Sequence, residues 1–151
     1  MGRAAVGIGS NLGEAEASVR AAIEALSAAG RIVRVSRLYK TRAWGVTRQP
    51  DFINAVVLLE TDLAPRALMT ALQRLERRLG RRPSFRWGPR AIDLDILTYD
   101  DARVDERDLQ IPHPRLYERA FALVPLAEVD PRFGAARDAL PERELHGVSP
   151  L

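Results

Sequence analysis

Apolar residues gather into short runs and amphipathic stretches along the chain, and the short runs predict four strands. Residues 4–9 (AAVGIG) form an apolar run that leads into a turn rich in Gly, Ser and Asn. Residues 31–39 and 52–61 are rich in β-branched and apolar side chains, and residues 91–99 (AIDLDILTY) alternate apolar with polar positions. Runs of this length and composition favour β-structure, so each segment is predicted to form one strand.

Two segments between these strands repeat their apolar residues with helical spacing. The first follows Ser10 or Asn11, either of which could cap a helix, and runs to about residue 29. The second starts at Pro65, a favourable first helical residue, and ends at Gly80. The apolar stripes are Val19, Ile23 and Leu26 in the first segment and Leu68, Leu72, Leu75 and Leu79 in the second. Both segments are therefore predicted to be amphipathic helices.

The last third of the chain adds further helical character. Residues 117–129 (YERAFALVPLAEV) are predicted to be helical, with an interruption at Pro125, because proline lacks the N–H that an unbroken helix uses. The element order is thus β-α-β-β-α-β with a helical C-terminal addition. This order predicts a ferredoxin-like α+β sandwich, in which helices cover a mainly antiparallel sheet. We expect one domain over residues 1–151, with residues 132–151 as a tail that matches no informative pattern.

Composition excludes several classes of protein. A chain of 151 residues with 46% hydrophobic and 28% charged residues is ordinary for one globular domain and unlike disordered, collagen-like or coiled-coil sequences. It has no cysteine, which excludes disulfides and thiolate chemistry. No segment approaches the ~20 apolar residues of a membrane span, and the first residues lack the apolar region of a signal peptide. We therefore expect a cytoplasmic protein without membrane contacts.

Positive charge is concentrated in one stretch of the chain. The formal net charge is only +3, whereas residues 73–95 hold seven arginines against three acids. Because the planar guanidinium group donates two parallel hydrogen bonds to phosphate oxygens, clustered arginine favours phosphate binding. A solvated, arginine-rich helix face is the structural alternative. The arginines are at positions 74, 77, 78, 81, 82, 86 and 90.

Asp93 and Asp95 carry the most specific chemical signal. Side chains alternate along a strand, so both carboxylates are expected on one face, with Cα atoms ~6.6 Å apart. Adjacent like charges repel and need cations to neutralise them. Those cations are either arginines or a hard ion such as Mg²⁺, which binds carboxylate oxygens and substrate phosphate. Beside the arginine-rich stretch, the acidic pair predicts a site that handles a nucleoside triphosphate.

Two common nucleotide-binding motifs do not account for this site. The sequence contains no G-x-x-x-x-G-K-S/T. Gly7, Gly9 and Gly13 are one residue out of register with G-x-G-x-x-G, and no acid ends the next predicted strand. The GIGSNLG segment is therefore predicted to be a tight turn from strand to helix.

Several motifs, in this order, resemble those of the 6-hydroxymethyl-7,8-dihydropterin pyrophosphokinase family. They are GIGSNLG, YKTRAWG, QPDFINAV, ERRLGRR, RWGPRAIDLDIL, IPHPR and ERAFALVPLAEV, and they span nearly the whole chain to Pro131. The resemblance implies transfer of the β,γ-pyrophosphoryl group of ATP to the pterin hydroxymethyl oxygen, with release of AMP, in folate biosynthesis. It implies ATP as co-substrate and two Mg²⁺ ions. We expect small-molecule substrates, no nucleic-acid partner and a monomer.

The resemblance also implies roles for single residues. Asp93 and Asp95 would hold the metal ions, in agreement with the strand pattern, and Arg81 and Arg90 would act on the transferred group. The implied ATP contacts are Gln73, Glu76, Arg82, Arg86, Trp87, Ile96, Leu109, His113 and Arg119. The implied pterin contacts are Thr41, Trp44, Gly45, Phe52, Asn54, Trp87 and Phe121. We expect Gln73 and Glu76 on the helix face opposite the leucine stripe.

The implied pterin contacts suit a flat heteroaromatic ring. Aromatic faces stack on such a ring, and the Asn54 amide both donates and accepts hydrogen bonds. Without the resemblance, core packing explains Phe52 and Phe121, and a backbone carbonyl would satisfy Asn54. Two positions depart from the family pattern: Ala43 replaces the usual proline, and Pro83 replaces an arginine for which the preceding arginine is the expected substitute.

Two other functions stay open. An RNA-binding module would use a ferredoxin-like sheet and the Arg-rich segment 74–90, where Phe85 and Trp87 are interleaved with the arginines. No RNP1-like run supports this function, and paired aspartates would repel phosphate. The other alternative is a catalytically inactive relative that serves as a structural partner, against which the intact aspartate pair and arginines argue.

Overall fold

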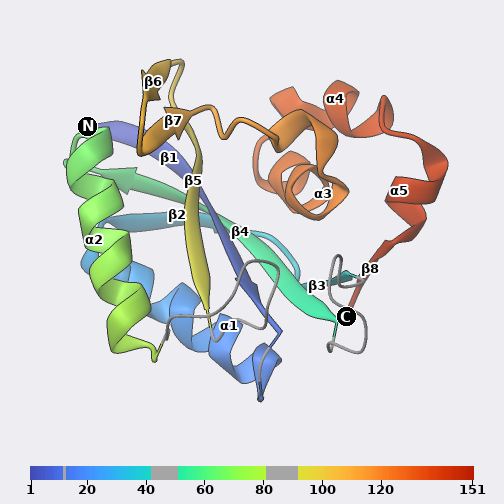
Figure 1. Cartoon of the computed structure of the whole chain (residues 1–151), viewed down its shortest axis with the longest axis horizontal. Coiled ribbons are helices and arrows are strands. Elements are labelled where there is room, and N and C mark those ends of the chain that lie inside the picture. Colours follow the sequence, from blue (N-terminus) through green and yellow to red (C-terminus); the bar gives the residue numbers. More distant parts are fainter. Residues whose placement is uncertain (12, 42–50, 81–91) are drawn as a thin grey trace.

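An antiparallel sheet of six strands lies at the centre of the described part of the chain (Figure 1). The computed structural model describes residues 1–11, 13–41, 51–80 and 92–151. Neighbouring strands follow the order β5–β1–β4–β3–β8, and β2 pairs with β4 beyond the end of β3. The strands are β1 (Gly2–Ser10), β2 (Arg31–Val35), β3 (Tyr39–Thr41), β4 (Phe52–Thr61), β5 (Asp93–Tyr99) and β8 (Val148–Pro150).

The predicted β-α-β-β-α-β order is present as β1, α1, β2, β4, α2 and β5. β1 and β4 are the inner strands of this core, with β5 next to β1 and β2 next to β4, and each of these pairs is antiparallel. The short strands β3 and β8 extend the sheet beyond this core. The predicted α+β architecture with an antiparallel sheet is confirmed.

The helices α1 (Ala15–Ala25) and α2 (Pro65–Arg78) cover one face of the sheet (Figure 1). A 3₁₀ turn, η1 (Leu26–Ala28), continues α1. Both apolar stripes predicted from the sequence point into the core, where they meet the even-numbered residues of β1 and the odd-numbered residues of β4. Burial of these apolar faces against the sheet fixes the two helices in place.

The helix α3 (Ala120–Val129) packs on the opposite face of the sheet, chiefly against β4. Its apolar residues form a second cluster with Ala5, Val56 and Leu97, one residue from each of the three strands β1, β4 and β5. After α3 the chain forms η3 (Pro131–Phe133), α4 (Gly134–Asp138) and α5 (Glu142–His146), and then returns to the sheet as β8. α3 therefore covers only part of this face, and the part near Gly7 and Gly9 is left to other residues.

Three local predictions are wrong. The segment 31–39 is two strands rather than one, because Ser36 between them accepts a hydrogen bond from the Val56 N–H at its side-chain oxygen, 2.9 Å away. Ser10 ends β1, and the residue before α1 is Glu14, which makes no side-chain cap. α3 runs through Pro125 without a break, since packing against β4 outweighs the loss of one helical hydrogen bond.

A β-hairpin follows β5, after the end of that strand at Tyr99. It consists of β6 (Val104–Glu106) and β7 (Leu109–Ile111), and η2 (Leu116–Glu118) leads from it to α3. Arg66 of α2 pairs with Glu106 and, at 3.0 Å, with Asp108, which fixes the hairpin to the start of α2. Among the described residues, every helix is too short or too polar to span a membrane.

Candidate functional site

Both aspartates of β5 project to the sheet face that α3 partly covers. Leu94 and Ile96 lie in the core under α1 and α2, whereas Leu97 packs against α3. Because side chains alternate along a strand, Asp93 and Asp95 share the face of Leu97. Asp93 is partly buried and Asp95 is exposed. The predicted placement of the two carboxylates on one face of a strand is confirmed.

Two glycines of β1 lie beside these aspartates. Gly9 pairs with Asp93 on one side and with Asn54 on the other, and Gly7 pairs with Asp95. A Cβ on Gly9 would lie 2.9 Å from Asn54 Nδ2, closer than a real Cβ atom approaches its neighbours. The surface of β1 between the carboxylates and Asn54 therefore has no side chain of its own, and a ligand can approach the backbone there.

The first half of the GIGSNLG segment is strand rather than turn. Gly7 and Gly9 are inside β1, which agrees with the strand predicted for residues 4–9 and corrects the assignment of the whole segment to a turn. A Cβ on Gly7 would lie 3.3 Å from the Leu97 side chain, so this position is also crowded. Glycine inside a strand often marks a close approach of a ligand or another group, and this signal was available from the spacing alone.

Two buried oxygen atoms on the same face have no hydrogen-bond partner in the described part of the chain. They are Thr41 Oγ1 of β3 and Asn54 Oδ1 of β4. Thr41 is 5% exposed and Asn54 is 8% exposed, and the partly buried Phe52 pairs with Thr41 across the two strands. An unsatisfied buried polar atom costs ~1–3 kcal/mol. A ligand with hydrogen-bond donors at this place would remove that cost.

Arg119 lies over an aromatic ring and interacts electrostatically with Asp95. Its guanidinium carbon is 5.4 Å from the centre of the Phe121 ring, a distance at which a cation and a ring face attract. Burial lowers the pKa of Arg119, and so does the nearby Arg115, whereas the charge of Asp95 acts in the opposite direction. The structure thus places Arg119 next to Phe121 and within electrostatic reach of Asp95.

His113 lies on the same side of the sheet. Its backbone N–H donates to the Leu97 carbonyl oxygen at 2.9 Å, which ties the segment after β7 to β5. Burial lowers the pKa of the His113 imidazole, and the positive charges of Arg119 and Arg115 lower it further. At neutral pH the imidazole is therefore uncharged. Its Nδ1 accepts a hydrogen bond from the Arg115 N–H at 3.4 Å, which leaves the Nε2–H as a donor.

Gln73 and Glu76 do not share one exposed face of α2. Gln73 is exposed, whereas Glu76 is 6% exposed, and its Oε2 accepts a hydrogen bond from the Leu94 N–H at 2.8 Å. The prediction that Glu76 lies opposite the leucine stripe is wrong. Glu76 instead lies beside the side of β5 that pairs with no strand among the described residues, where the Leu94 backbone N–H needs an acceptor.

Ile96 and Leu109 are placed in the core by the structure. Their side chains are 7% and 6% exposed and belong to the cluster under α1 and α2. They therefore lie on the opposite face of the sheet from Asp93 and Asp95. A direct contact with a ligand is left to their backbone atoms. Those of Ile96 belong to β5, which pairs on one side only among the described residues, and those of Leu109 belong to β7.

A polar cluster next to the candidate site has no counterpart in the sequence predictions. Tyr39 of β3 donates its hydroxyl hydrogen to the carboxylate of Glu128 in α3, and Arg37 Nε donates to the same carboxylate at 3.3 Å. Tyr39 pairs with Asn54 across β3 and β4. The sequence holds no pattern that joins Tyr39 to a residue 89 positions away, so only tertiary structure could find this contact.

Seven of the implied site residues lie outside the described part of the chain, as do the departures Ala43 and Pro83. They are Trp44, Gly45, Arg81, Arg82, Arg86, Trp87 and Arg90. Within the described residues, no three His, Cys, Asp or Glu side chains come together as metal ligands. Asp93 and Asp95 are a pair, which is the number of carboxylates that a protein-bound Mg²⁺ ordinarily takes.

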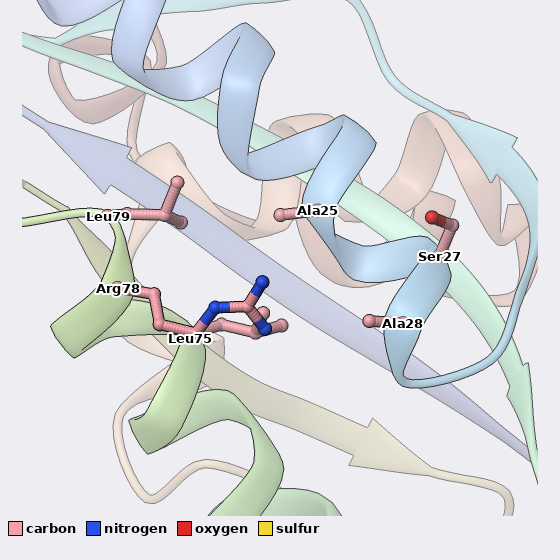
Figure 2. Close-up of a pocket in the computed structure, with 6 residues that line it drawn as sticks. All are labelled: Ala25, Ser27, Ala28, Leu75, Arg78 and Leu79. Atoms are coloured by element: carbon pink, nitrogen blue, oxygen red, sulfur yellow. The ribbon is translucent and has the colours of Figure 1, made fainter.

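A cavity of about 350 Å³ lies on the other side of the molecule (Figure 2). It is formed where the C-terminal ends of α1 and α2 approach each other, and Arg78 and Leu75 reach into it from α2. These helices cover the sheet face opposite to Asp95, so the cavity is separate from the candidate site.

Comparison with known proteins gives a family match over most of the chain. Residues 5–131 match the family model of 7,8-dihydro-6-hydroxymethylpterin-pyrophosphokinase (HPPK). The 2-amino-4-hydroxy-6-hydroxymethyldihydropteridine pyrophosphokinase of Methylorubrum extorquens is 42% identical over 98% of this chain and 98% of its own length. The protein of the same name from Bacillus subtilis is 41% identical over 82% of this chain and 75% of its own length.

Solved structures give the same fold. A crystal structure of HPPK-DHPS in complex with substrates matches 91% of this chain with a TM-score of 0.72 at 12% sequence identity. The Plasmodium falciparum HPPK-DHPS structure with SDX-DHP matches the same share with a TM-score of 0.69. This chain spans 43% of the length of each of those proteins.

The family match decides between the functions that the sequence left open. Relatives at about 40% identity are named as pyrophosphokinases, and one from Arabidopsis thaliana is named as a bifunctional protein of folate synthesis. Nothing in these comparisons supports an RNA-binding module. The chain therefore belongs to the 7,8-dihydro-6-hydroxymethylpterin-pyrophosphokinase family and is an ATP-dependent pyrophosphokinase of folate biosynthesis.

Proposed function

We propose that this chain transfers the β,γ-pyrophosphoryl group of ATP to the hydroxymethyl oxygen of 6-hydroxymethyl-7,8-dihydropterin on the sheet face that carries Asp93, Asp95 and Asn54. In this reaction the hydroxymethyl oxygen attacks the β-phosphorus, the bond from this phosphorus to the α,β-bridging oxygen breaks, and AMP leaves. The hydroxyl proton is released, and we assign no general base. Phosphoryl transfer of this kind depends mainly on positioning and charge neutralisation.

The observation that carries this proposal is the arrangement around the glycines of β1. Asp93 and Asp95 lie on one side of Gly7 and Gly9, and the unsatisfied Asn54 Oδ1 lies on the other side. A phosphate chain beside the carboxylates and a pterin beside Asn54 would then meet over the part of β1 that has no side chains. The Asn54 side chain over Gly9 would then contact the pterin next to the phosphate chain.

The donor set at this face fits Mg²⁺, and we propose that two ions bind with ATP. Asp93 and Asp95 supply oxygen ligands only, and they pair with Gly9 and Gly7, which have no side chains that could compete for the carboxylates. When bound, the ions neutralise the charge of the phosphate oxygens. The two aspartates hold and orient them, and their exposure to the open part of the face lets phosphate oxygens complete the coordination.

Arginines supply the remaining positive charge around the phosphates. We propose that Arg81 and Arg90 neutralise charge that develops on the transferred group, and that Arg119 contacts the phosphates from α3. The support for Arg119 is its contact with the Phe121 ring and its electrostatic interaction with Asp95. The neutral imidazole of His113 would donate a hydrogen bond from Nε2 to ATP, because its Nδ1 already accepts from the Arg115 N–H. The other proposed ATP contacts are Gln73, Glu76, Arg82, Arg86, Trp87, Ile96 and Leu109.

The positions of three of these residues restrict how they act on ATP. Glu76 already binds the Leu94 N–H, so its first effect is to fix β5, the strand that holds the aspartates. Ile96 and Leu109 have side chains in the core, which leaves their backbone atoms for a nucleotide. These contacts would bind the nucleoside at the outer edge of β5, beside the phosphates.

The proposed pterin contacts combine hydrogen-bonding and stacking groups. Thr41 and Asn54 each offer a buried oxygen without a partner among the described residues, and both suit the donors of an aminopyrimidine edge. Phe52 and Phe121 are partly buried and present aromatic faces. Trp44, Gly45 and Trp87 complete the proposed set.

Further features of the protein are also proposals. We propose that residues 1–151 form one domain that acts as a monomer on small molecules, because two clusters of buried residues share one sheet. We propose a cytoplasmic location, since ATP is the co-substrate.

One assay tests the proposed function directly. Purified protein is incubated with ATP, Mg²⁺ and 6-hydroxymethyl-7,8-dihydropterin, and the nucleotide product is identified by chromatography. AMP together with the pterin diphosphate is the expected result. Formation of ADP would show transfer of a single phosphoryl group and overturn the proposal, and absence of any product would favour an inactive relative.

A further inference from the structure

The end of the chain forms part of the sheet next to the proposed pterin contacts. The strand β8 pairs antiparallel with β3, and Figure 1 shows the two strands side by side near the C-terminus. The family match ends at residue 131, so β8 belongs to the segment 132–151, for which no role was predicted. Thr41 of β3 is opposite Val148 of β8.

The hydrogen-bond pattern shows how β8 is attached. The Leu151 N–H donates to the Leu38 carbonyl oxygen at 3.0 Å. Hydrogen-bonded and non-hydrogen-bonded pairs alternate along an antiparallel ladder, so Lys40 and Ser149 form the next hydrogen-bonded pair. Pro150 occupies a non-hydrogen-bonded position, where its missing N–H leaves the ladder intact. The attachment therefore depends on the backbone of Ser149 and Leu151.

The pairing also places the Val148 side chain of β8 next to Thr41, whose Oγ1 has no hydrogen-bond partner among the described residues. Phe52, Thr41 and Val148 form one row across β4, β3 and β8, and side chains of paired residues project to the same face. Thr41 and Val148 are a non-hydrogen-bonded pair, in which Cβ atoms are closest, ~4.5–5.5 Å apart. Val148 is partly buried, whereas Ser149 is exposed and points to the opposite face.

β3 has only three residues, so its position depends on its neighbours. β4 holds it on one side and β8 on the other. Glu128 of α3 adds a side-chain contact to Tyr39, two residues before Thr41. Removal of β8 would leave β3 as an edge strand of three residues, and Thr41 is the last of them.

We propose that the C-terminal strand β8 is a positioning element for the pterin: it fixes β3 and thereby the Thr41 hydroxyl beside Asn54. This inference rests on the proposed function, because it takes Thr41 and Asn54 as pterin contacts. The ATP side of the site is on β5, at the other end of the sheet, so loss of β8 affects the pterin selectively.

The test compares Ser149→Pro with Ser149→Ala in the full chain. Ser149→Pro removes the N–H that the Lys40 pair requires, whereas Ser149→Ala changes only an exposed side chain. We expect Ser149→Pro to raise the KM for 6-hydroxymethyl-7,8-dihydropterin about tenfold and to leave the KM for ATP within twofold. Ser149→Ala should match the wild type. Hydrogen exchange of residues 39–41 should become faster in Ser149→Pro only.

The possible outcomes separate the two proposals. A wild-type protein that forms no AMP refutes the proposed function, whatever the variants do. An active wild type with unchanged pterin KM in Ser149→Pro, despite faster exchange at residues 39–41, refutes the role of β8. An equal rise in both KM values refutes it as well. A deletion of residues 148–151 removes the strand without a new proline, and failure of both variants to fold would show that β8 serves global stability instead.

Discussion

Asn54 Nδ2 lies over the backbone of Gly9, at a place where even a methyl group on Gly9 would be only 2.9 Å away. The two residues are partners in the β1–β4 ladder, and their side chains project to the face that carries the aspartates of β5. The position of the Asn54 amide thus depends on the missing side chain of its neighbour. Its Oδ1 is left without a partner among the described residues, available to a ligand.

Replacement of Gly9 by alanine should therefore displace Asn54. We expect Gly9→Ala to raise the KM for the pterin about tenfold or more, because a displacement of about 1 Å in a binding group has effects of this size. Steady-state kinetics with each substrate varied in turn measures this change. In an Asn54→Ala background the same Gly9→Ala change should add little, since the group that it displaces is already absent. Additive effects in this double-mutant cycle would contradict the prediction.

Asp95 should be needed for catalysis and contribute little to folding. Its side chain is exposed at the open part of the sheet face, so Asp95→Asn should leave the melting temperature within a few degrees of the wild type. We expect kcat to fall about 10³-fold, because the neutral amide is a poor ligand for Mg²⁺. Asp62→Asn, which alters an exposed aspartate outside the site, is the matched control. Near-normal turnover of Asp95→Asn at ordinary Mg²⁺ concentrations would refute the metal-binding role.

Glu76 should contribute to stability through β5. Glu76→Ala leaves the buried Leu94 N–H without its acceptor, and we expect the free energy of unfolding to fall by ~1–3 kcal/mol. Glu76→Gln keeps an acceptor oxygen in the same place and should lose less. Urea unfolding of both variants measures the difference. Equal destabilisation by the two substitutions would show that the carboxylate charge, rather than the hydrogen bond, is what matters.

His113 should make stability depend on pH in a narrow window. Its pKa is lowered below the ordinary value of 6.5 by burial and by Arg119 and Arg115, so the unfolded state binds the proton more readily than the folded state. Stability then rises with pH through this range and is lost as pH falls below 6.5 toward the folded pKa. Urea midpoints at pH 7.5 and about pH 5.5 should differ in the wild type, and His113→Gln should reduce that difference.

The acidic groups provide the internal control for this pH effect. The pKa values of Glu128 and Asp130 are lowered from 4.5 and 3.8, so their contributions are lost only as pH falls below those values. Loss of stability between pH 7.5 and 5.5 is therefore attributable to histidine. A His113→Gln variant with the same pH dependence as the wild type would contradict this assignment.

The local alternation of side chains in the sequence was enough to predict how the two aspartates of the site lie on β5. Alternation along a strand placed Asp93 and Asp95 on one face, and the structure confirms this because strand geometry is a local property. The same reasoning failed for Glu76, since a helix position at the margin of an apolar stripe becomes buried or exposed according to what packs beside it. It also failed for Pro125, where packing on β4 keeps a helix continuous.

The sequence by itself determined the family, the order of strands and helices, and the acidic pair, because these depend on residues close together along the chain. Only the tertiary structure showed that Gly9 makes room for Asn54, that Glu128 contacts Tyr39, and that the last residues of the chain pair with β3. Such contacts join segments separated by tens of residues. Their energy comes from pairing and packing that exist only once the sheet has formed, so no local pattern in the sequence records them.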